Sequence, residues 1–318
     1  MKRFNIYFLM GFLFTGLSAM ATTWDEPWQD KIIREADSFV LAKVLSFDAE
    51  KGVEIKILKN LAGKELPVQT KITGFYLLHL CSRSGNEGPE FYFKGVDSCY
   101  FFLKKNDKGN QAIATPTSGY AALKDGNVYA TYRHSYHQAI VLSDTYEQTM
   151  TAIFNNYHGL TYDKNFIKSY VEKYLSLKPA GFSKDEIPTF CAQHVALESI
   201  YHLQLTEYYT LILPFLYHTE NMHNQISAAR ALTWYHSKEA QEALLKMIED
   251  KKTNIFAQVI CIWALEDSKP VAQKEKLTKI AKDASTEENG FGGNIMDPRV
   301  CTSFPTVKGA IDAMIQKL

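Results

Sequence analysis

The sequence predicts an α+β protein of two domains, a small antiparallel β-barrel followed by an α-helical solenoid. Short strand patterns separated by turn residues fill the chain up to residue 142, and helical periodicity takes over from residue 143. Several residues of the second part recur at a displacement of 33 positions, which indicates a repeat. The expected boundaries are 1–21 for a signal peptide, 22–142 for the barrel and 143–318 for the helical domain.

The first 21 residues have the pattern of a secretory signal peptide. A basic pair at 2–3 precedes an apolar run over 4–17, which is too short for a bilayer span of about 20 residues. Ala19 and Ala21 form the small-residue exit that signal peptidase accepts, so we expect a mature chain that begins at Thr22. We expect an exported bacterial protein, periplasmic or secreted, with no stable membrane insertion after cleavage. A membrane anchor is the alternative interpretation.

The charges of the chain are balanced. There are 35 Lys and Arg against 35 Asp and Glu, with 46% hydrophobic and 22% charged residues. Loss of the signal peptide removes two basic residues and leaves a formal net charge of −2. A nucleic-acid-binding protein needs a basic excess or a basic stripe, so we expect no nucleic-acid partner.

The barrel is expected from a series of short segments rich in β-branched, aliphatic and aromatic residues. These segments are 37–47, 52–61, 66–75, 100–103, 112–114, 120–123 and 128–132. The last two flank Asp125-Gly126, which predicts a hairpin because glycine tolerates the positive φ that a tight turn requires.

Four of these stretches, in this order, resemble the netrin-like, metalloproteinase-inhibitor-like version of the OB barrel. They are ADSFVLAKV (36–44), VEIKILKNLAG (53–63), DSCYFFLKK (97–105) and KDGNVYA (124–130). In metalloproteinase inhibitors of this type, an amino-terminal Cys binds the zinc of the target. Here Thr22 stands at the expected amino terminus, so the resemblance implies the fold and not the inhibition.

Helices are expected from residue 143 onward. Asp144 and Glu147 have the spacing of a capping box, which predicts a helix that runs to about Tyr157. A second helix is expected over 164–177, before the helix-breaking segment 179–181.

The repeat is visible in four matched positions. Ala231-Leu232 recurs as Ala264-Leu265, Leu244 as Leu277, Met247 as Ile280 and Asp250 as Asp283. Ala196-Leu197 and Leu211 belong to an earlier, less regular copy. About three two-helix repeats over 189–284 resemble HEAT-type repeats, whereas the consensus residues of ankyrin and TPR repeats are missing.

The end of the chain is expected to complete the helical stack. The helix expected over 253–265 has an apolar band too wide for one wet face, so we expect cover on two faces. A loop is expected over 285–305, which contains glycines and has no periodicity, and a capping helix over 306–318.

Five cysteines in an exported chain suggest at least one disulfide. We expect Cys81 to pair with Cys99, because both lie in the predicted barrel. Cys191 and Cys261 lie two repeats apart, beyond the Cα separation of about 7 Å that a disulfide permits. Cys301 could pair with one of those two or stay free, and the odd total leaves at least one thiol unpaired within the chain.

No recognised catalytic motif is present, and we assign no catalytic, cofactor-binding or metal-binding residue. His134 and His137 form H-x-x-H, which places them on opposite faces of a strand, and no HExxH glutamate accompanies them. Cys191 and His194 share a helical face without a second ligand pair. Zinc sites need three or four converging ligands, so structural or surface roles are favoured for these residues.

Four aromatic residues form a candidate binding surface. They are Tyr208, Tyr209, Trp234 and Tyr235. Exposed aromatic groups line many binding grooves, but residues of this kind more often belong to the core.

Two classes of function remain open. The favoured one is a non-catalytic interaction or scaffolding protein of the cell envelope, with another protein as partner, because solenoids mainly supply extended binding faces. The alternative is an unrecognised exported hydrolase or metal-dependent enzyme that uses His134 or His137. A bound metal, or a deep pocket that holds a histidine and a carboxylate together, would favour the enzyme.

Overall fold

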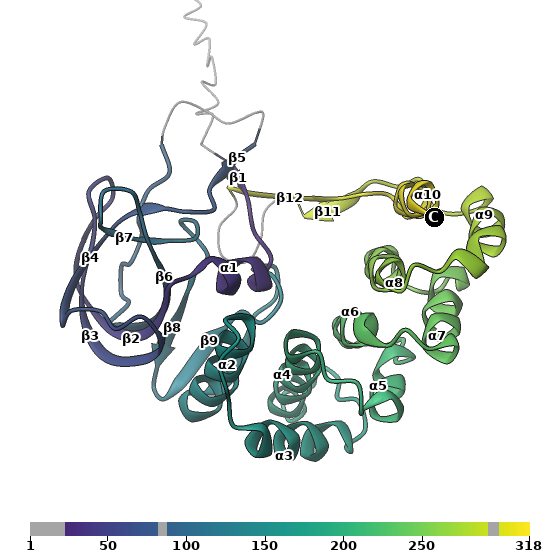
Figure 1. The fold of residues 1–318 in the computed structure, drawn as a ribbon, viewed down its shortest axis with the longest axis horizontal. Coiled ribbons are helices and arrows are strands. Elements are labelled where there is room, and N and C mark those ends of the chain that lie inside the picture. The colour runs from purple at the N-terminus through teal and green to yellow at the C-terminus, as the bar shows by residue number, and fades with distance from the viewer. Residues whose placement is uncertain (1–22, 82–87, 292–298) are drawn as a thin grey trace, which may run out of the picture.

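The computed structural model describes residues 23–81, 88–291 and 299–318. The expected signal peptide and Thr22 lie outside the described residues. The described chain has a mixed α+β fold, with a closed five-stranded barrel and ten α-helices. Figure 1 shows the barrel on one side and the helices in an arc that leads away from it. None of the described helices is long and apolar enough to cross a membrane.

Five strands close the barrel. They are β2 (Ser38–Asp48), β3 (Gly52–Gly63), β4 (Gln69–Phe75), β6 (Ser98–Lys105) and β7 (Gln111–Ile113). Around the barrel the order is β2, β3, β4, β7, β6 and again β2. Each pairing is antiparallel except that between β4 and β7, which is parallel. The predicted barrel is therefore confirmed, with one parallel contact in place of a wholly antiparallel sheet.

Three further strands extend the sheet from β6: β8 (Tyr120–Lys124), β9 (Asn127–Ala130) and β10 (Ala139–Leu142). Asp125 and Gly126 connect β8 to β9 with φ values of 51° and 77°. The predicted hairpin is confirmed, because both turn residues have the positive φ of a tight turn.

The alternation of residues explains how the barrel is filled. In β3, Val53 and Ile55 are buried whereas Glu54 and Lys56 are exposed. At the start of β3, Gly52 has a φ of 112°, and a Cβ there would lie 1.9 Å from the carbonyl oxygen of Ile72. The strand pair is therefore close enough to require glycine.

The outer face of the barrel is also covered. Phe39 of β2 stacks on Phe102 of β6, with ring centroids 4.7 Å apart. Both side chains belong to the large core that includes helices α1 (Gln29–Glu35) and α2 (Ser143–Tyr157). The barrel and the helices therefore share a continuous hydrophobic core.

The expected helix α2 is confirmed, but the prediction that a capping box begins it is wrong. The N-cap position is Leu142, and no side chain caps the helix there. Glu147 instead accepts hydrogen bonds from Lys59 Nζ at 2.9 Å and Tyr100 Oη at 2.9 Å. The Glu147 carboxylate therefore binds two side chains of the barrel and does not cap the start of its own helix.

The next helix, α3 (Lys164–Leu175), is followed by three successive pairs. The pairs are α4 (Ile187–Leu203) with α5 (Tyr209–Leu216), α6 (Met222–Ala231) with α7 (Lys238–Glu249), and α8 (Ile255–Asp267) with α9 (Lys274–Lys282). In Figure 1, α2, α4, α6 and α8 form the inner row of the arc, and α3, α5, α7 and α9 the outer row. Leu244 of α7 and Leu277 of α9 are both buried, so these residues of the repeat occupy equivalent positions.

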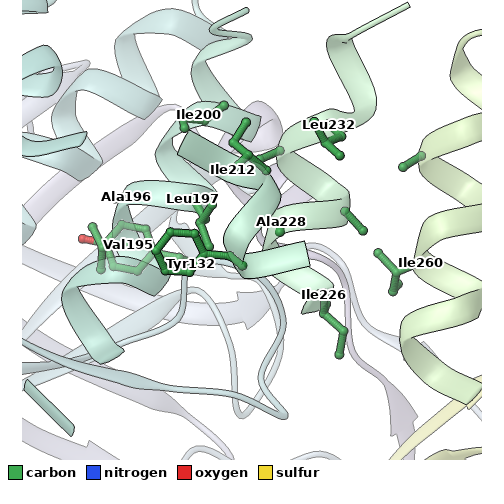
Figure 2. Close-up of a cluster of buried hydrophobic side chains, with 14 of the residues drawn as sticks. Tyr132, Val195, Ala196, Leu197, Ile200, Ile212, Ile226, Ala228, Leu232 and Ile260 are labelled. Carbon is green, nitrogen blue, oxygen red and sulfur yellow. The ribbon is translucent and has the colours of Figure 1, made fainter. Parts of the chain in front are cut away.

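The inner helices pack through small and branched apolar residues. Figure 2 shows Val195 of α4, Ile226 and Ala228 of α6 and Ile260 of α8 in one cluster. All four are at most 2% exposed. The helix α8 also packs against α7 and against α10 (Val307–Lys317), which confirms the expected cover of α8 and the expected terminal helix.

The predicted loop over 285–305 is wrong, because it contains two strands. These are β11 (Asn289–Phe291) and β12 (Val300–Phe304). They form a sheet in the order β11, β12, β1 (Trp24–Asp25), β5 (His79–Leu80), in which β1 and β12 are parallel. Strands this short have no recognisable period, and β12 pairs with β1 from the opposite end of the described chain.

The predicted Cys81–Cys99 disulfide is also wrong. Cys81 pairs with Cys301, across a sequence separation of 220 residues. Cys99 is a free thiol in the interior of the barrel, because the alternation of β6 turns its side chain inward. Cys191 and Cys261 are free and buried, which agrees with the expectation that they do not pair.

The shared core predicts that Phe154 of α2 stabilises both parts of the chain. Its side chain is 0% exposed and stacks on Phe39 and His158, with centroid distances of 6.5 and 4.2 Å. Phe154→Ala is expected to lower the free energy of unfolding by about 3–5 kcal/mol, measured by urea denaturation. Leu160→Ala, at a side chain 52% exposed, is the control and should change it by about 0.5 kcal/mol or less. Equal effects would contradict a shared core.

Candidate functional site

A pocket of about 870 Å³ lies where the N-terminal segment, the inner helices and the C-terminal strand meet. We call it the central pocket. Its lining residues are Asp25, Glu26, Pro27, Trp28, Asp30, Lys31, His79, His134, Tyr201, Arg230, Thr233, Ile260, Trp263, Ala264, Glu266, Asp267, Lys269, Thr302, Ser303, Phe304, Pro305 and Lys317. Several of the elements that supply them, among them β1, α1, α6, α8 and β12, surround the middle of the molecule in Figure 1.

Three aromatic side chains join the walls of the central pocket. Trp28 precedes α1, Trp263 lies on α8, and Phe304 ends β12. Their ring centroids are 6.1 Å apart for the two tryptophans, 6.3 Å for Trp28 and Phe304, and 5.9 Å for Trp263 and Phe304. The indole of Trp263 is 37% exposed. The pocket therefore offers an aromatic surface to a ligand.

Arg230 of α6 forms the positive part of the wall. Its guanidinium lies 3.8 Å from the ring centroid of Tyr201 and 4.8 Å from that of Trp28. Its Nε donates to Glu198 Oε2 at 2.9 Å. Although burial disfavours the charge, Glu198 and other neighbours hold the pKa of Arg230 above its usual value. Arg230 is therefore positively charged, and the carboxylate of Glu198 balances that charge behind the aromatic wall.

A buried polar network extends from Glu198 away from the pocket. Ser227 Oγ donates to Glu198 Oε1 at 2.7 Å and lies 3.0 Å from both Arg133 Nη1 and His194 Nδ1. A hydroxyl has one proton, so Arg133 and His194 are the donors to Ser227. Ser227 is 0% exposed and does not line the central pocket. This Ser, His and Glu arrangement is therefore structural and does not activate a nucleophile.

Glu26 is the deepest carboxylate of the central pocket and is 3% exposed. Its Oε1 accepts from Trp24 Nε1 at 2.8 Å, from Thr115 Oγ1 at 2.8 Å and from Thr117 Oγ1. Its Oε2 is enclosed and has no hydrogen-bond partner among the described residues. Burial raises the pKa of Glu26, and the hydrogen bonds to Oε1 oppose that shift.

The two histidines of the H-x-x-H motif lie in the buried loop between β9 and β10 and not on a strand. His134 lines the central pocket. Its Nε2 lies 3.1 Å from the carbonyl oxygen of Glu26 and its Nδ1 lies 3.4 Å from the amide nitrogen of Tyr136. His137 instead packs against His194 and His223, with centroid distances of 4.3 and 4.4 Å. The two histidines of the motif therefore lie in different environments, His134 in the wall of the central pocket and His137 beside two other histidines.

No group of three or more His, Cys, Asp or Glu among the described residues is placed to hold a metal ion. Both ring nitrogens of His134 are taken by the backbone, and burial lowers its pKa to about 4. A neutral histidine in this state has no free nitrogen for a substrate. The geometry of the pocket suits binding better than proton transfer.

The four aromatic residues of the expected binding surface lie outside the central pocket. Tyr208 and Tyr235 are buried, and the amide of Tyr208 donates to Tyr235 Oη at 2.9 Å. Tyr209 packs 5.9 Å from the ring centroid of Tyr235. Trp234 Nε1 donates to the carbonyl oxygen of Tyr201 at 2.7 Å. These contacts agree with the alternative interpretation, in which the four aromatic residues belong to the core.

Sequence reasoning missed Glu26, Trp28, Arg230 and Trp263. Arg230 is the one Lys, Arg, Asp or Glu in α6 and stands between alanines, and Trp263 lies in the wide apolar band of α8. Either position gives a local signal of an unusual environment. Nothing near Glu26 and Trp28 in the sequence links them to residues more than two hundred positions away.

The chain matches no protein-family model, no curated protein and no solved structure. The chemistry of the central pocket therefore carries the functional proposal.

Loss of the Cys81–Cys301 disulfide is expected to destabilise the wall formed by residues 302–305. Closing so long a loop stabilises a fold by about 2–5 kcal/mol. Cys301→Ser should therefore lower the melting temperature, measured by calorimetry without reductant. Cys191→Ser, at a free cysteine, is the control for the loss of a thiol. A Cys301→Ser chain as stable as the native one would show that the disulfide does not hold the wall.

Acid is expected to destabilise the fold through its buried histidines. Burial lowers the pKa of His134 to about 4 and that of His223 to about 3, below the ordinary value of 6.5. As the pH falls, each of these histidines is protonated in the unfolded chain before it is protonated in the folded chain. Their contribution to the free energy of unfolding is therefore complete above pH 6.5 and is lost below it. We expect a loss of about 2 kcal/mol per group by pH 5.

Denaturation curves at several pH values between 7.5 and 5 measure this dependence. His223→Asn should make it shallower, because one group with a lowered pKa is removed. His236→Asn, at an exposed side chain, should leave it unchanged. Stability that is constant over this range would contradict the assignment.

Proposed function

We propose that this chain is an exported, non-catalytic interaction protein of the cell envelope, and that its central pocket receives a segment of a partner protein. The observation that carries the proposal is the pocket itself. Segments from both ends of the chain and from the inner helices enclose it, its wall holds the partly exposed indole of Trp263, and its two most buried charged groups, Glu26 and Arg230, are held by hydrogen bonds. Binding pockets commonly combine an apolar lining with a few placed polar groups.

Export, to the periplasm or the exterior of a bacterial cell, rests on two features. The sequence begins with a pattern typical of a signal peptide, and the described chain has a disulfide between Cys81 and Cys301. Disulfides persist mainly in oxidising compartments.

We also infer the finer fold relationships from the architecture. The barrel strands, taken in chain order, follow the path first, second, third, fifth, fourth and first, and the third and fifth are parallel. A closed five-stranded barrel of this kind supports the netrin-like OB resemblance. Three helix pairs, the last two of which are displaced by 33 residues, support HEAT-type repeats. The division into two domains at residue 142 stays a prediction, because the hydrophobic core continues across it.

The enzyme alternative has one observation in its favour. The central pocket holds His134 together with the carboxyl groups of Asp25 and Glu26. Against it, the ring nitrogens of His134 are bound to backbone groups, and Oε1 of Glu26 accepts three hydrogen bonds. We therefore favour the interaction protein.

Capture from envelope extract tests the proposal. The bait is the immobilised mature chain, compared with Trp263→Ala, which removes the half-exposed indole of the pocket, and with Val271→Ala, a control at a side chain 61% exposed outside it. We expect a protein that the native and control baits retain and that Trp263→Ala loses at least tenfold. The melting temperature of each bait confirms folding. Capture of no protein, or equal capture by all three baits, would contradict the proposal.

A further inference from the structure

One wall of the central pocket carries three carboxyl groups without an ion pair. Asp25, Glu26 and Asp30 all line the pocket. The ion pairs among the described residues include none of the three. Arg230, the one arginine among the lining residues, is bound to Glu198 at 2.9 Å, whereas Lys31 of the same lining acts on Asp25 only through space. Acidic residues alone do not define a ligand site, so a second and independent observation is needed.

That observation is a pair of enclosed oxygen atoms. The parallel register of β1 and β12 pairs Trp24 with Val300 and Asp25 with Cys301. Glu26 and Thr302 are the next residues on the two chains, and we infer from this register that they lie side by side. The two residues are 3% and 7% exposed, and both line the pocket. Glu26 Oε2 and Thr302 Oγ1 have no hydrogen-bond partner among the described residues. Both oxygen atoms therefore keep the capacity to accept a hydrogen bond at the wall of the pocket.

The available acceptors select the kind of cation. Glu26 Oε1 already accepts from three donors, so only Oε2 is free. A guanidinium binds a carboxylate best through both oxygens, whereas an ammonium is a compact charge with three rotatable donors. One carboxylate oxygen and one hydroxyl oxygen therefore suit an ammonium better than a guanidinium.

We propose that the corner formed by Glu26 and Thr302 binds the ammonium group of a lysine side chain from the partner protein. The four-carbon stem of the lysine packs along the indoles of Trp28 and Trp263, as amphipathic side chains commonly do on aromatic surfaces. Asp25 and Asp30 add negative charge near the entrance. This inference rests on the proposed function, because it names what the central pocket takes from the partner.

Titration of the mature chain with Nα-acetyl-lysine N-methylamide tests the inference. The indole N–H of Trp24 donates to Glu26 Oε1 at 2.8 Å, so its NMR resonance reports directly on this corner. Nα-acetyl-norleucine N-methylamide, which has the stem without the ammonium, is the matched probe. We expect the lysine probe to shift the Trp24 resonance and the norleucine probe to leave it in place. Alaninamide separates a lysine side chain from a free amino terminus.

Variants locate the binding. Glu26→Gln removes the charge and keeps the shape, and should weaken the lysine probe at least tenfold. Thr302→Val removes only the hydroxyl and should weaken it severalfold, which keeps the test valid if Glu26→Gln fails to fold. Glu275→Gln is the control, because it also removes one negative charge, at a side chain that is 84% exposed and lies outside the central pocket. It should bind the lysine probe as the native chain does.

Several outcomes would overturn the inference. Equal binding of the lysine and norleucine probes would exclude recognition of the ammonium. Unchanged affinity in both Glu26→Gln and Thr302→Val would place the ammonium elsewhere, and preferential binding of alaninamide would assign the corner to an amino terminus. If a partner is captured through the pocket while the lysine probe does not bind, the lysine site fails and the proposed function stands.

Discussion

The parallel contact between β1 and β12 is the constraint on which the functional part of the molecule depends. It joins the first described strand to the last and brings Glu26, Trp28 and Thr302 into one wall. In Figure 1 the helices form an arc, and β12 runs across its open side to reach β1. The contact itself is short, with only two paired positions on each strand. The Cys81–Cys301 disulfide and the aromatic contacts of Phe304 therefore supply much of its stability.

A second constraint holds the other wall. Arg133, from the loop after β9, and Arg230, from α6, both face Glu198 of α4 at 3.7 and 2.9 Å. Burial of such charges is costly unless each is bound, and removal of one partner typically costs about 3–5 kcal/mol. The backbone carbonyl of Arg133 also accepts from the amide of Gln29 at 2.8 Å. The network therefore connects the barrel, the helices and the N-terminal segment in a defined position.

Local patterns in the sequence predicted most of the fold. Alternation identified the barrel strands, a displaced set of residues identified the helix pairs, and Asp125-Gly126 identified a hairpin. The errors have a common physical origin in contacts between distant residues. Glu147 binds Lys59 and Tyr100 and does not cap its own helix. Cys81 forms a disulfide with Cys301, and the strands β11 and β12 form where the sequence has no visible period. The central pocket could not be predicted for the same reason, since its walls meet only after these contacts form.

The same dependence links closure of the chain to binding. An occupant that touches both Glu26 and Trp263 contacts the N-terminal wall and the helical wall together, so it favours the closed arrangement over any open one. The Cys81–Cys301 disulfide and the contacts of Phe304 with Trp28 and Trp263 already hold these two walls together. The pocket is therefore preorganised, so an occupant uses little of its binding free energy to bring the walls together.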